Sequence, residues 1–437
     1  ANARILHSLM SNTEKSSGLW TRSHKITKLN VAGDQNEAGD ASNSAQSLLG
    51  QVVYIRYMET IAGMCMVELT FVDTNGFLDS LPIRSGMRLE LEINHASREE
   101  DPFSFSGTKN NDLIVVNISD VKRESKREIF TLTCVTRTTL SNHTTRVFQR
   151  YDGNITDSVE KILTETLEID SSRYKLDKTS NAYSFTGNYL RPINCISRLA
   201  AKSVSSYDKM SKEEGLAGFV FFESELTGYN FRSVDEMLKI EPKFQKYKQT
   251  GFKDAMDTDP FVISSQPVFV ESHDLIKKLR MGQYKSNNVV YNIMSRNVDF
   301  YEYQSKVNDD KDVPSDVDEL TSRRLLTVLD LGLTTKEGDE LKEDAEAISW
   351  RHAHVAARYQ SLFSQKLKVS IPMNLNLEVG QTLEFDFPDI NTGDKPRGQT
   401  PSSGKYLIAK LVHGFGDPRG DFTGLSLVRD SFTPSAE

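Results

Sequence analysis

Short runs rich in β-branched and aromatic residues, with polar residues between them, fill the chain from residue 51 to residue 147. Alternation with a period of two is typical of half-buried β-strands. The pattern predicts strands at 52–57, 64–72, 89–93, 113–118 and 129–135. Residues 51–147 are therefore expected to form one all-β domain.

Helical signals follow residue 148. Asp157 and Glu160 have the spacing of a capping box, in which two side chains satisfy backbone N–H groups of the first helical turn. This spacing predicts a helix that begins next to Asp157. Pro192 is expected in the first turn of a second helix, over residues 193–204, because proline fits the start of a helix.

Two aromatic runs after the second helix predict a β-hairpin. They lie at 218–223 and 229–234, and the polar residues between them end in Gly228. Two helices and a hairpin make a compact α+β unit. Residues 148–240 are therefore expected to form an α+β domain that ends in this hairpin.

The rest of the chain divides into a region of irregular pattern and a second β domain. Residues 241–335 are predicted to be a mixed connecting region, with a helix near 275–279, a strand at 289–293 and an acidic loop at 308–319. A long amphipathic helix is expected next, because apolar positions recur at spacings of three and four, at Leu341, Ala345, Ile348, His352, Val355, Tyr359 and Leu362.

Strand patterns return after this helix. They predict strands at 375–377, 383–387, 406–412 and 425–428, so residues 336–437 are expected to form a helix plus a second β domain. Residues 1–50 are poor in periodic hydrophobic positions and rich in turn formers. They are expected to form an N-terminal arm or an extended segment.

The two β regions resemble each other. Each contains a turn glycine followed by alternating apolar and mostly acidic positions, at 86–93 and at 380–387. The next strand follows at the same distance, since Leu113 lies 27 residues after Gly86 and Leu407 lies 27 residues after Gly380. This agreement predicts one strand-rich fold used twice. Three copies of such a chain would present six similar modules around one axis, so that a trimer could dock onto a hexameric ring.

Composition and charge narrow the class of protein. The 437 residues carry a net charge of −8, which argues against a surface built to grip a phosphate backbone. No apolar run approaches the roughly 18–20 residues that span a bilayer, and the N-terminus lacks a secretory pattern, so we expect folding in a cytoplasm and no membrane insertion by this chain. The three cysteines, Cys65, Cys134 and Cys195, lie far apart and are expected to be buried spectators.

The sequence offers no catalytic, cofactor-binding or metal-binding residue, and we expect a protein that is not an enzyme. The usual phosphate-binding, dinucleotide-binding, zinc-protease and hydrolase motifs are absent. His352 and His354 are two apart on the predicted helix, so their side chains diverge, and His352 is expected to pack on the apolar stripe. The acidic loop has the spacing of a calcium ligand set, but Val313 stands where the sharp turn needs glycine, so we expect a solvated loop. The basic run 122–127 is expected at a hairpin tip.

The order of these parts resembles the baseplate hub protein of T-even-like contractile-tailed phages and, more distantly, the hub portion of type VI secretion spikes. The resemblance covers about residues 51–430. It rests most on the hairpin 218–238 preceded by the helix 193–204, and on the helix before Ser349 followed by the strand 380–387. It implies a β-rich α+β fold in which residues 51–147 and 336–437 are two similar tail-tube-like β-barrel domains.

The resemblance also implies a function, that of a homotrimeric hub in the tail baseplate of a virion, assembled in the bacterial host cytoplasm. One face would meet the tail tube ring, the other would carry the central spike or tail lysozyme, and other baseplate proteins would surround it. The channel would pass the tape measure protein and DNA without specific binding, which suits the acidic net charge. The alternatives are a tail-associated cell-wall hydrolase, a glycan-binding protein, or the hub of a contractile injection or type VI secretion system.

Overall fold

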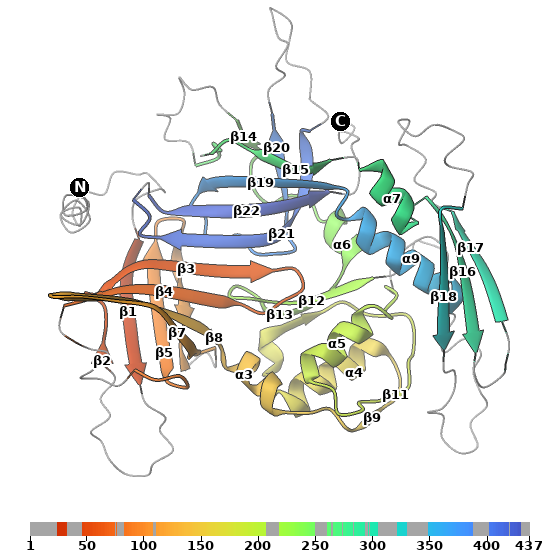
Figure 1. The fold of residues 1–437 in the computed structure, drawn as a ribbon, viewed down its shortest axis with the longest axis horizontal. Coiled ribbons are helices and arrows are strands. Elements are labelled where there is room, and N and C mark those ends of the chain that lie inside the picture. Colours follow the sequence, from red (N-terminus) through yellow and green to blue (C-terminus); the bar gives the residue numbers. More distant parts are fainter. Residues whose placement is uncertain are drawn as a thin grey trace, which may run out of the picture.

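The computed structural model is rich in β-structure, which confirms the predicted β-rich α+β class (Figure 1). It describes residues 24–32, 46–74, 76, 83–107, 111–206, 218–249, 260–263, 265–272, 274–282, 284–292, 296, 298–304, 321–329, 348–387, 402–418 and 420–429. Three groups of elements can be followed in the ribbon: a large twisted sheet, a helical unit below it, and a small sheet covered by a helix.

The first β region contains all five predicted strands and one that the sequence reading missed. Its strands are β3 (Val52–Thr60), β4 (Met66–Asp73), β5 (Arg88–His95), β6 (Arg98–Phe105), β7 (Leu113–Glu124) and β8 (Arg127–Thr136). Buried and partly exposed residues alternate along β4 and β8, because one face of these strands covers the core. The missed strand is β6, which pairs with β5.

A further strand lies inside the range expected to be an arm. Strand β1 (His24–Ala32) pairs antiparallel with β5, and the two-residue strand β2 (Gln46–Ser47) pairs with β1. Leu29 and Val31 of β1 are buried in the main core. Residues 24–32 are therefore a paired strand of the large sheet, which the expectation of an arm or an extended segment for residues 1–50 did not include.

The second β region contains β19 (Gln365–Pro372), β20 (Thr382–Asp386), β21 (Gly404–Phe415) and β22 (Phe422–Arg429). Its edges are extended by the short strands β14 (Tyr247–Lys248) and β15 (Val268–Ser272). The strand predicted at 375–377 is wrong. Leu375 and Leu377 are buried in a connecting segment, and the strand lies earlier, at β19.

The two β regions form one continuous sheet. Its order is β15-β19-β22-β21-β3-β4-β8-β7-β5-β1-β2, and the regions meet where β21 pairs antiparallel with β3. Among the strands that the structure describes, this path is open and closes into no barrel, so the two-barrel arrangement is not confirmed.

The repeat is visible in the strand pairing. Gly86 N–H donates to Val115 O, and Gly380 N–H donates to Ile408 O, at 2.7 and 3.0 Å. Directly after each acceptor, the pairing with the next strand shifts by one residue, between Val115 and Asn117 and between Ile408 and Lys410. Both halves thus share a turn glycine and a β-bulge. Leu113 pairs with Leu89 and Tyr406 pairs with Leu383, so the counterpart of Leu113 in the second half is Tyr406, one residue before the Leu407 that the sequence spacing suggested.

The unit below the sheet has its own core. It contains α3 (Arg137–Thr144), α4 (Ile155–Lys161), α5 (Pro192–Ala200) and the predicted hairpin of β12 (Phe219–Ser224) and β13 (Gly228–Ser233). Helix α6 (Val234–Lys239) follows the hairpin, and its Val234 and Met237 are buried in the main core. Pro192 stands at the start of α5, as predicted. The predicted capping box is wrong, because α4 begins at Ile155 after Asn154.

The mixed region includes the small sheet that is covered by a helix. Strands β17 (Val298–Gln304), β16 (Lys285–Asn292) and β18 (Arg323–Leu329) lie beside α7 (Leu275–Met281) and α9 (Ile348–Ser361). The predicted helix near 275–279 and strand near 289–293 are confirmed. The start of the predicted long helix and the acidic loop 308–319 lie outside the described residues.

Candidate functional site: a polar junction

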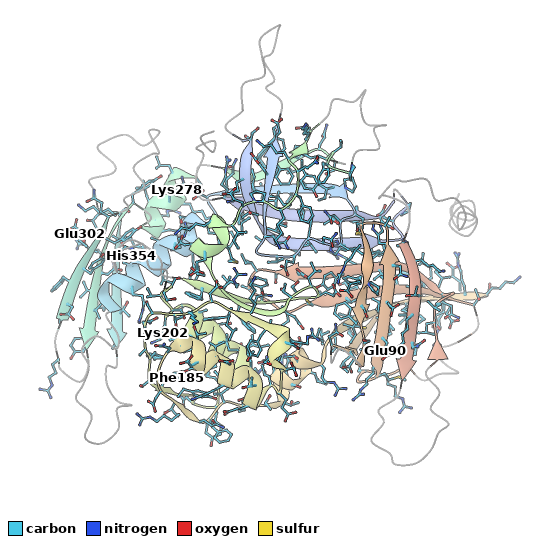
Figure 2. The ribbon with its side chains drawn as sticks, turned by 180° about the vertical axis from the view of Figure 1, so that it is seen from behind. Glu90, Phe185, Lys202, Lys278, Glu302 and His354 are labelled. Carbon is cyan, nitrogen blue, oxygen red and sulfur yellow. The ribbon has the colours of Figure 1, made fainter. Side chains whose placement is uncertain are left out.

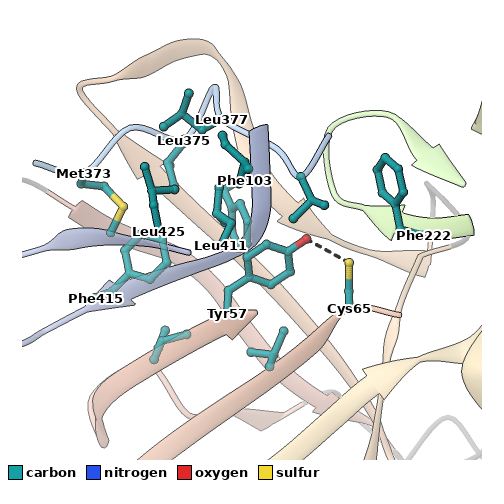
Figure 3. Packing of buried hydrophobic residues seen from close by; sticks show 14 of the residues in the cluster. Tyr57, Cys65, Phe103, Phe222, Met373, Leu375, Leu377, Leu411, Phe415 and Leu425 are labelled. Carbon is teal, nitrogen blue, oxygen red and sulfur yellow. Dashed lines mark hydrogen bonds between the residues drawn. The ribbon is translucent and has the colours of Figure 1, made fainter. Parts of the chain in front are cut away.

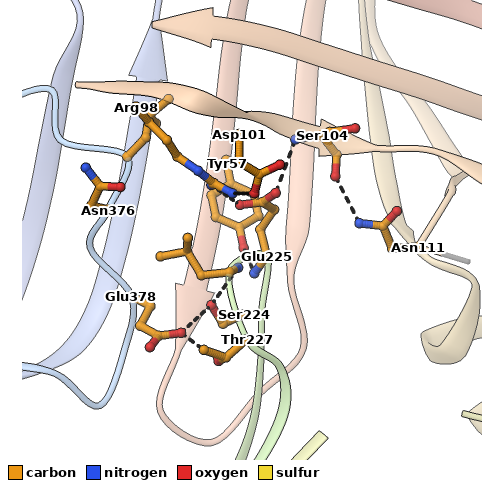
Figure 4. Close-up of polar contacts among 12 residues, drawn as sticks. Tyr57, Arg98, Asp101, Ser104, Asn111, Ser224, Glu225, Thr227, Asn376 and Glu378 are labelled. Atoms are coloured by element: carbon orange, nitrogen blue, oxygen red, sulfur yellow. Dashed lines mark hydrogen bonds and ion pairs between the residues drawn. The ribbon is translucent and has the colours of Figure 1, made fainter. Parts of the chain in front are cut away.

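The tip of the β12–β13 hairpin inserts where the two β regions meet (Figure 4). The aromatic strand β12 is buried along its whole length, so the hairpin is held between the helical unit and the large sheet. Its turn ends at Gly228, whose φ is +75°, and a Cβ there would lie 2.1 Å from Arg173 O. The local sequence therefore places three polar residues of the tip, Ser224, Glu225 and Thr227, against both β regions.

Glu59 of β3 is buried at the centre of the junction. Its Oε1 accepts hydrogen bonds from Tyr57 Oη at 2.5 Å and from the backbone N–H of Glu225 at 3.2 Å. Its Oε2 accepts one from Val379 N–H at 3.0 Å. Burial raises the pKa of Glu59 to about 7, helped by the Glu378 carboxylate and opposed by these hydrogen bonds. One side chain thus connects the first β region, the hairpin and the second β region.

Glu223 and Cys65 fix the other side of the hairpin tip. Glu223 Oε2 accepts hydrogen bonds from Cys65 N–H at 3.1 Å and from Thr136 Oγ1 at 3.0 Å. Burial raises the pKa of the Glu223 carboxyl above its ordinary value, and the same two hydrogen bonds oppose this shift without cancelling it. The Cys65 thiol lies 3.0 Å from Tyr57 Oη, and burial raises its pKa, so it is not a reactive thiolate.

Arg98 and Glu225 form a buried ion pair in the junction. Arg98 Nη1 lies 2.6 Å from Glu225 Oε2, and both side chains are less than one tenth exposed. Glu225 Oε1 also accepts from Ser104 N–H, and Arg98 Nη2 donates to Asp101. Separating or removing either partner of a buried ion pair leaves an uncompensated charge, which costs free energy. The pair therefore favours the one arrangement of β6 and the hairpin tip in which both partners meet.

The second β region holds the hairpin through Glu378. Its Oε2 accepts hydrogen bonds from Ser224 Oγ at 3.0 Å and from Thr227 Oγ1 at 2.6 Å. Nearby, Asn376 Nδ2 donates to Ser97 O at 2.6 Å, and Leu375 N–H donates to Ser97 Oγ. The connecting segment before β20 is thus attached both to the hairpin and to the turn between β5 and β6.

An apolar core continues from this junction (Figure 3). Tyr57 and Phe103 pack edge to face, and Met373, Leu375, Leu411, Phe415 and Leu425 belong to the same buried cluster. His413 is also buried there, and its surroundings lower its pKa to about 3, through burial and the charges of His95 and Arg98. A neutral His413 fits a packing role.

The arrangement is that of a structural joint. Every carboxylate in it accepts hydrogen bonds from named protein donors, and no group of three or more metal-ligating side chains occurs in the described part of the chain. The sequence reading nominated none of these acids. No local sequence pattern marks these acids, because their contacts join distant parts of the chain: Glu59 and Glu225 are 166 residues apart.

The residues that the sequence singled out lie elsewhere. His354 of α9 faces the small sheet, with Tyr301 Oη 3.0 Å from its Nε2 (Figure 2). The side chain of His352 lies outside the described residues. The basic run 122–127 lies at the tip of the β7–β8 hairpin, as predicted, and the three cysteines are buried. None of the helices among the described residues is long and apolar enough to span a bilayer.

Comparison of the sequence with protein families and with curated proteins gives no match. Solved structures do match. The 43 kDa tail protein of prophage MuSo2 from Shewanella oneidensis aligns with a TM-score of 0.54 at 10% identity, over 93% of this chain and 99% of that protein. The chain has the fold of a phage tail protein.

Two further structures extend the comparison. The tail protein from Neisseria meningitidis MC58 aligns with a TM-score of 0.50 at 8% identity, over 92% of this chain and 96% of that protein. A component of the type VI secretion system from E. coli aligns with a TM-score of 0.42 at 11% identity, over 92% of this chain and 77% of that protein. The shared tail-protein fold covers nearly the whole chain, and the predicted resemblance is confirmed at the level of fold.

Proposed function

We propose that the chain is the structural baseplate hub of a contractile phage tail, a homotrimer that joins the hexameric tail tube to a trimeric central spike. The observation that carries the proposal is the pairing of β21 with β3, which places two copies of one strand pattern side by side in a single sheet. Three such chains supply six similar modules, which is the number needed to match a sixfold ring.

The polar junction supports a structural role. Its buried acids and its Arg98–Glu225 ion pair lock the hairpin between the two β regions, so that both modules keep one orientation. A ring that transmits contact from a tube to a spike needs this rigidity. In the proposed hub the axial channel passes the tape measure protein and then DNA, and the net charge of −8 disfavours binding of the passing DNA. Its place is the tail baseplate of a virion, next to the tube ring, the spike or tail lysozyme and other baseplate proteins.

Electron microscopy of the purified full chain tests this proposal. We expect rings with threefold symmetry, a near-sixfold inner rim and an open channel, and we expect these rings to bind a hexameric tail tube protein. Particles without a ring, together with turnover of cell-wall polymer in a zymogram, would contradict the hub and favour the hydrolase.

A further inference from the structure

Strand β15 is an open edge of the large sheet. It pairs with β19 on one side, and on the other side no strand among the described residues covers it (Figure 1). Three successive side chains on it, Val268, Phe269 and Val270, are 55%, 40% and 50% exposed. An apolar strand at a sheet edge is a template for pairing with another strand.

A second open edge lies at the distal part of β7. The beginning of β7 is covered on one side by β5, through Leu113 and Ile114, and by the hydrogen bonds between Val115 and the turn at Gly86. From Asn117 onward, β8 is the single strand partner of β7 within the described part of the chain. Val121 is 46% exposed on this stretch.

The repeat shows what covers such an edge. The corresponding strand in the second half is β21, whose first residues are covered by β20 and whose residues from Lys410 to Phe415 pair antiparallel with β3. Strand β3 lies next to β4 at one end of the four-strand series β3-β4-β8-β7, just as β15 lies next to β19 at one end of the series β15-β19-β22-β21. In the order of the sheet, β3 begins the series β3-β4-β8-β7 and β21 ends the series β15-β19-β22-β21, so inside one chain the strand that begins one series covers the open part of the strand that ends the other.

The register of this contact can be carried over residue by residue. In each repeat, four residues on four neighbouring strands lie opposite one another across the sheet. In the first repeat they are Tyr57, Val67, Cys134 and Val115, and in the second they are Phe269, Leu367, Leu427 and Ile408. Phe269 is thus the counterpart of Tyr57. By the same correspondence, the residues of β7 that match His413 and Gly414 are Val121, at the β-bulge, and Lys122.

We propose that β15 of one copy pairs antiparallel with the open part of β7 in a second copy of this chain, in the register of the β3–β21 contact. Val268 then lies opposite Lys122, as Arg56 lies opposite Gly414, and Phe269 lies beside Val121. The contact covers the apolar side chains on both edges. The number of copies that close the ring, three, rests on the proposed function.

Cysteine cross-linking in the full chain tests the pairing. The variant V268C/K122C places thiols on directly opposite residues of an antiparallel pair, at the separation that a disulfide accepts. The matched control is V268C/K126C, in which the second cysteine replaces another exposed lysine of the same hairpin, outside the predicted register. The native cysteines are buried in both variants. We expect oxidised V268C/K122C to give covalent dimers and trimers on a non-reducing gel, and the control to stay monomeric.

The native mass of the same samples separates this proposal from the proposed function. A trimeric mass with no cross-link, or with equal cross-linking in the control, would overturn the β15–β7 pairing and leave the trimeric hub in place. A monomeric mass with no cross-link would contradict both.

Discussion

The ring of Tyr57 in β3 stacks on the ring of His413 in β21, with centroids 5.9 Å apart and planes 12° from parallel. These two residues face each other across the strand pair that unites the two β regions. The hydroxyl of the same tyrosine reaches the polar junction, where it contacts Glu59 and Cys65. Packing between the repeats and the hydrogen bonds of the hairpin therefore depend on one side chain.

We predict that Tyr57→Phe lowers the free energy of unfolding by about 1–3 kcal/mol, because it leaves the buried Glu59 carboxyl without its shortest hydrogen bond. Tyr54→Phe, on the same strand but only partly buried, is the control and should change it by less than about 0.5 kcal/mol. Chemical denaturation of both variants measures the difference. Equal losses of unfolding free energy for Tyr57→Phe and Tyr54→Phe would show that the buried Tyr57 hydroxyl stabilises the fold no more than a partly exposed one.

The raised pKa of Glu59 predicts a pH dependence of stability. The folded chain holds this proton up to about pH 7, whereas an unfolded glutamate releases it near its ordinary pKa of 4.5. The folded state binds more protons between these values, so the stabilisation falls as pH rises from 4.5 through 7, by about 3 kcal/mol in total. Glu59→Gln removes this titration.

Denaturation at pH 5 and pH 8 measures the effect. Glu68→Gln, on the neighbouring strand β4 where Glu68 pairs with Arg56 at the surface, serves as the control. The stability difference between the native chain and Glu59→Gln should shift in favour of the variant by about 2.5 kcal/mol from pH 5 to pH 8. A difference that is the same at both pH values would contradict the buried, protonated carboxyl.

The two turn glycines of the repeat should respond differently to alanine. Both have positive φ, +97° at Gly86 and +85° at Gly380, so each substitution costs about 1–2 kcal/mol of backbone strain. A Cβ at Gly86 meets nothing within 4 Å, but one at Gly380 would lie 2.9 Å from Phe222 Cζ. We expect Gly380→Ala to destabilise the chain by about 1–3 kcal/mol more than Gly86→Ala. Equal melting temperatures for the two variants would argue against close packing of the hairpin on the second β region.

The Arg98–Glu225 ion pair should matter far more than an exposed one. We expect Arg98→Met to cost about 3–5 kcal/mol, because it leaves Glu225 buried and uncompensated. Arg56→Met breaks the surface pair with Glu68 and should cost at most about 1 kcal/mol. Denaturation curves of the two variants compare the costs, and a cost for Arg98→Met no larger than for Arg56→Met would refute the proposed locking role.

The sequence predicted the strands whose apolar residues keep a regular period. It failed at β1, where the pairing with β5 shifts between Ile26 and Lys28 and the bulge interrupts the alternation that ends in Leu29 and Val31. It also assigned a strand to Leu375 and Leu377, whose alternation arises because both side chains fill the main core from a connecting segment. The signal for β19 was present, since Leu367, Val369 and Ile371 alternate with polar residues.

The polar junction could not be predicted in the same way. Each of its acids lies in an ordinary local context, and many of the partners are far away in the sequence, such as Cys65, which is 158 residues from Glu223, and Val379, which is 320 residues from Glu59. Only the fold brings them together. The sequence spacing also matched Leu113 with Leu407 instead of Tyr406, an error of one residue. It has a similar origin, because a bulge and a turn change the spacing without changing the pattern of apolar positions.

The central claim is that this chain forms a trimeric ring, and the native mass in solution tests it most directly. Light scattering during size-exclusion chromatography should give three times the chain mass of 49.3 kDa, alone or with a trimeric spike protein added. A mass of one chain under both conditions would contradict the hub.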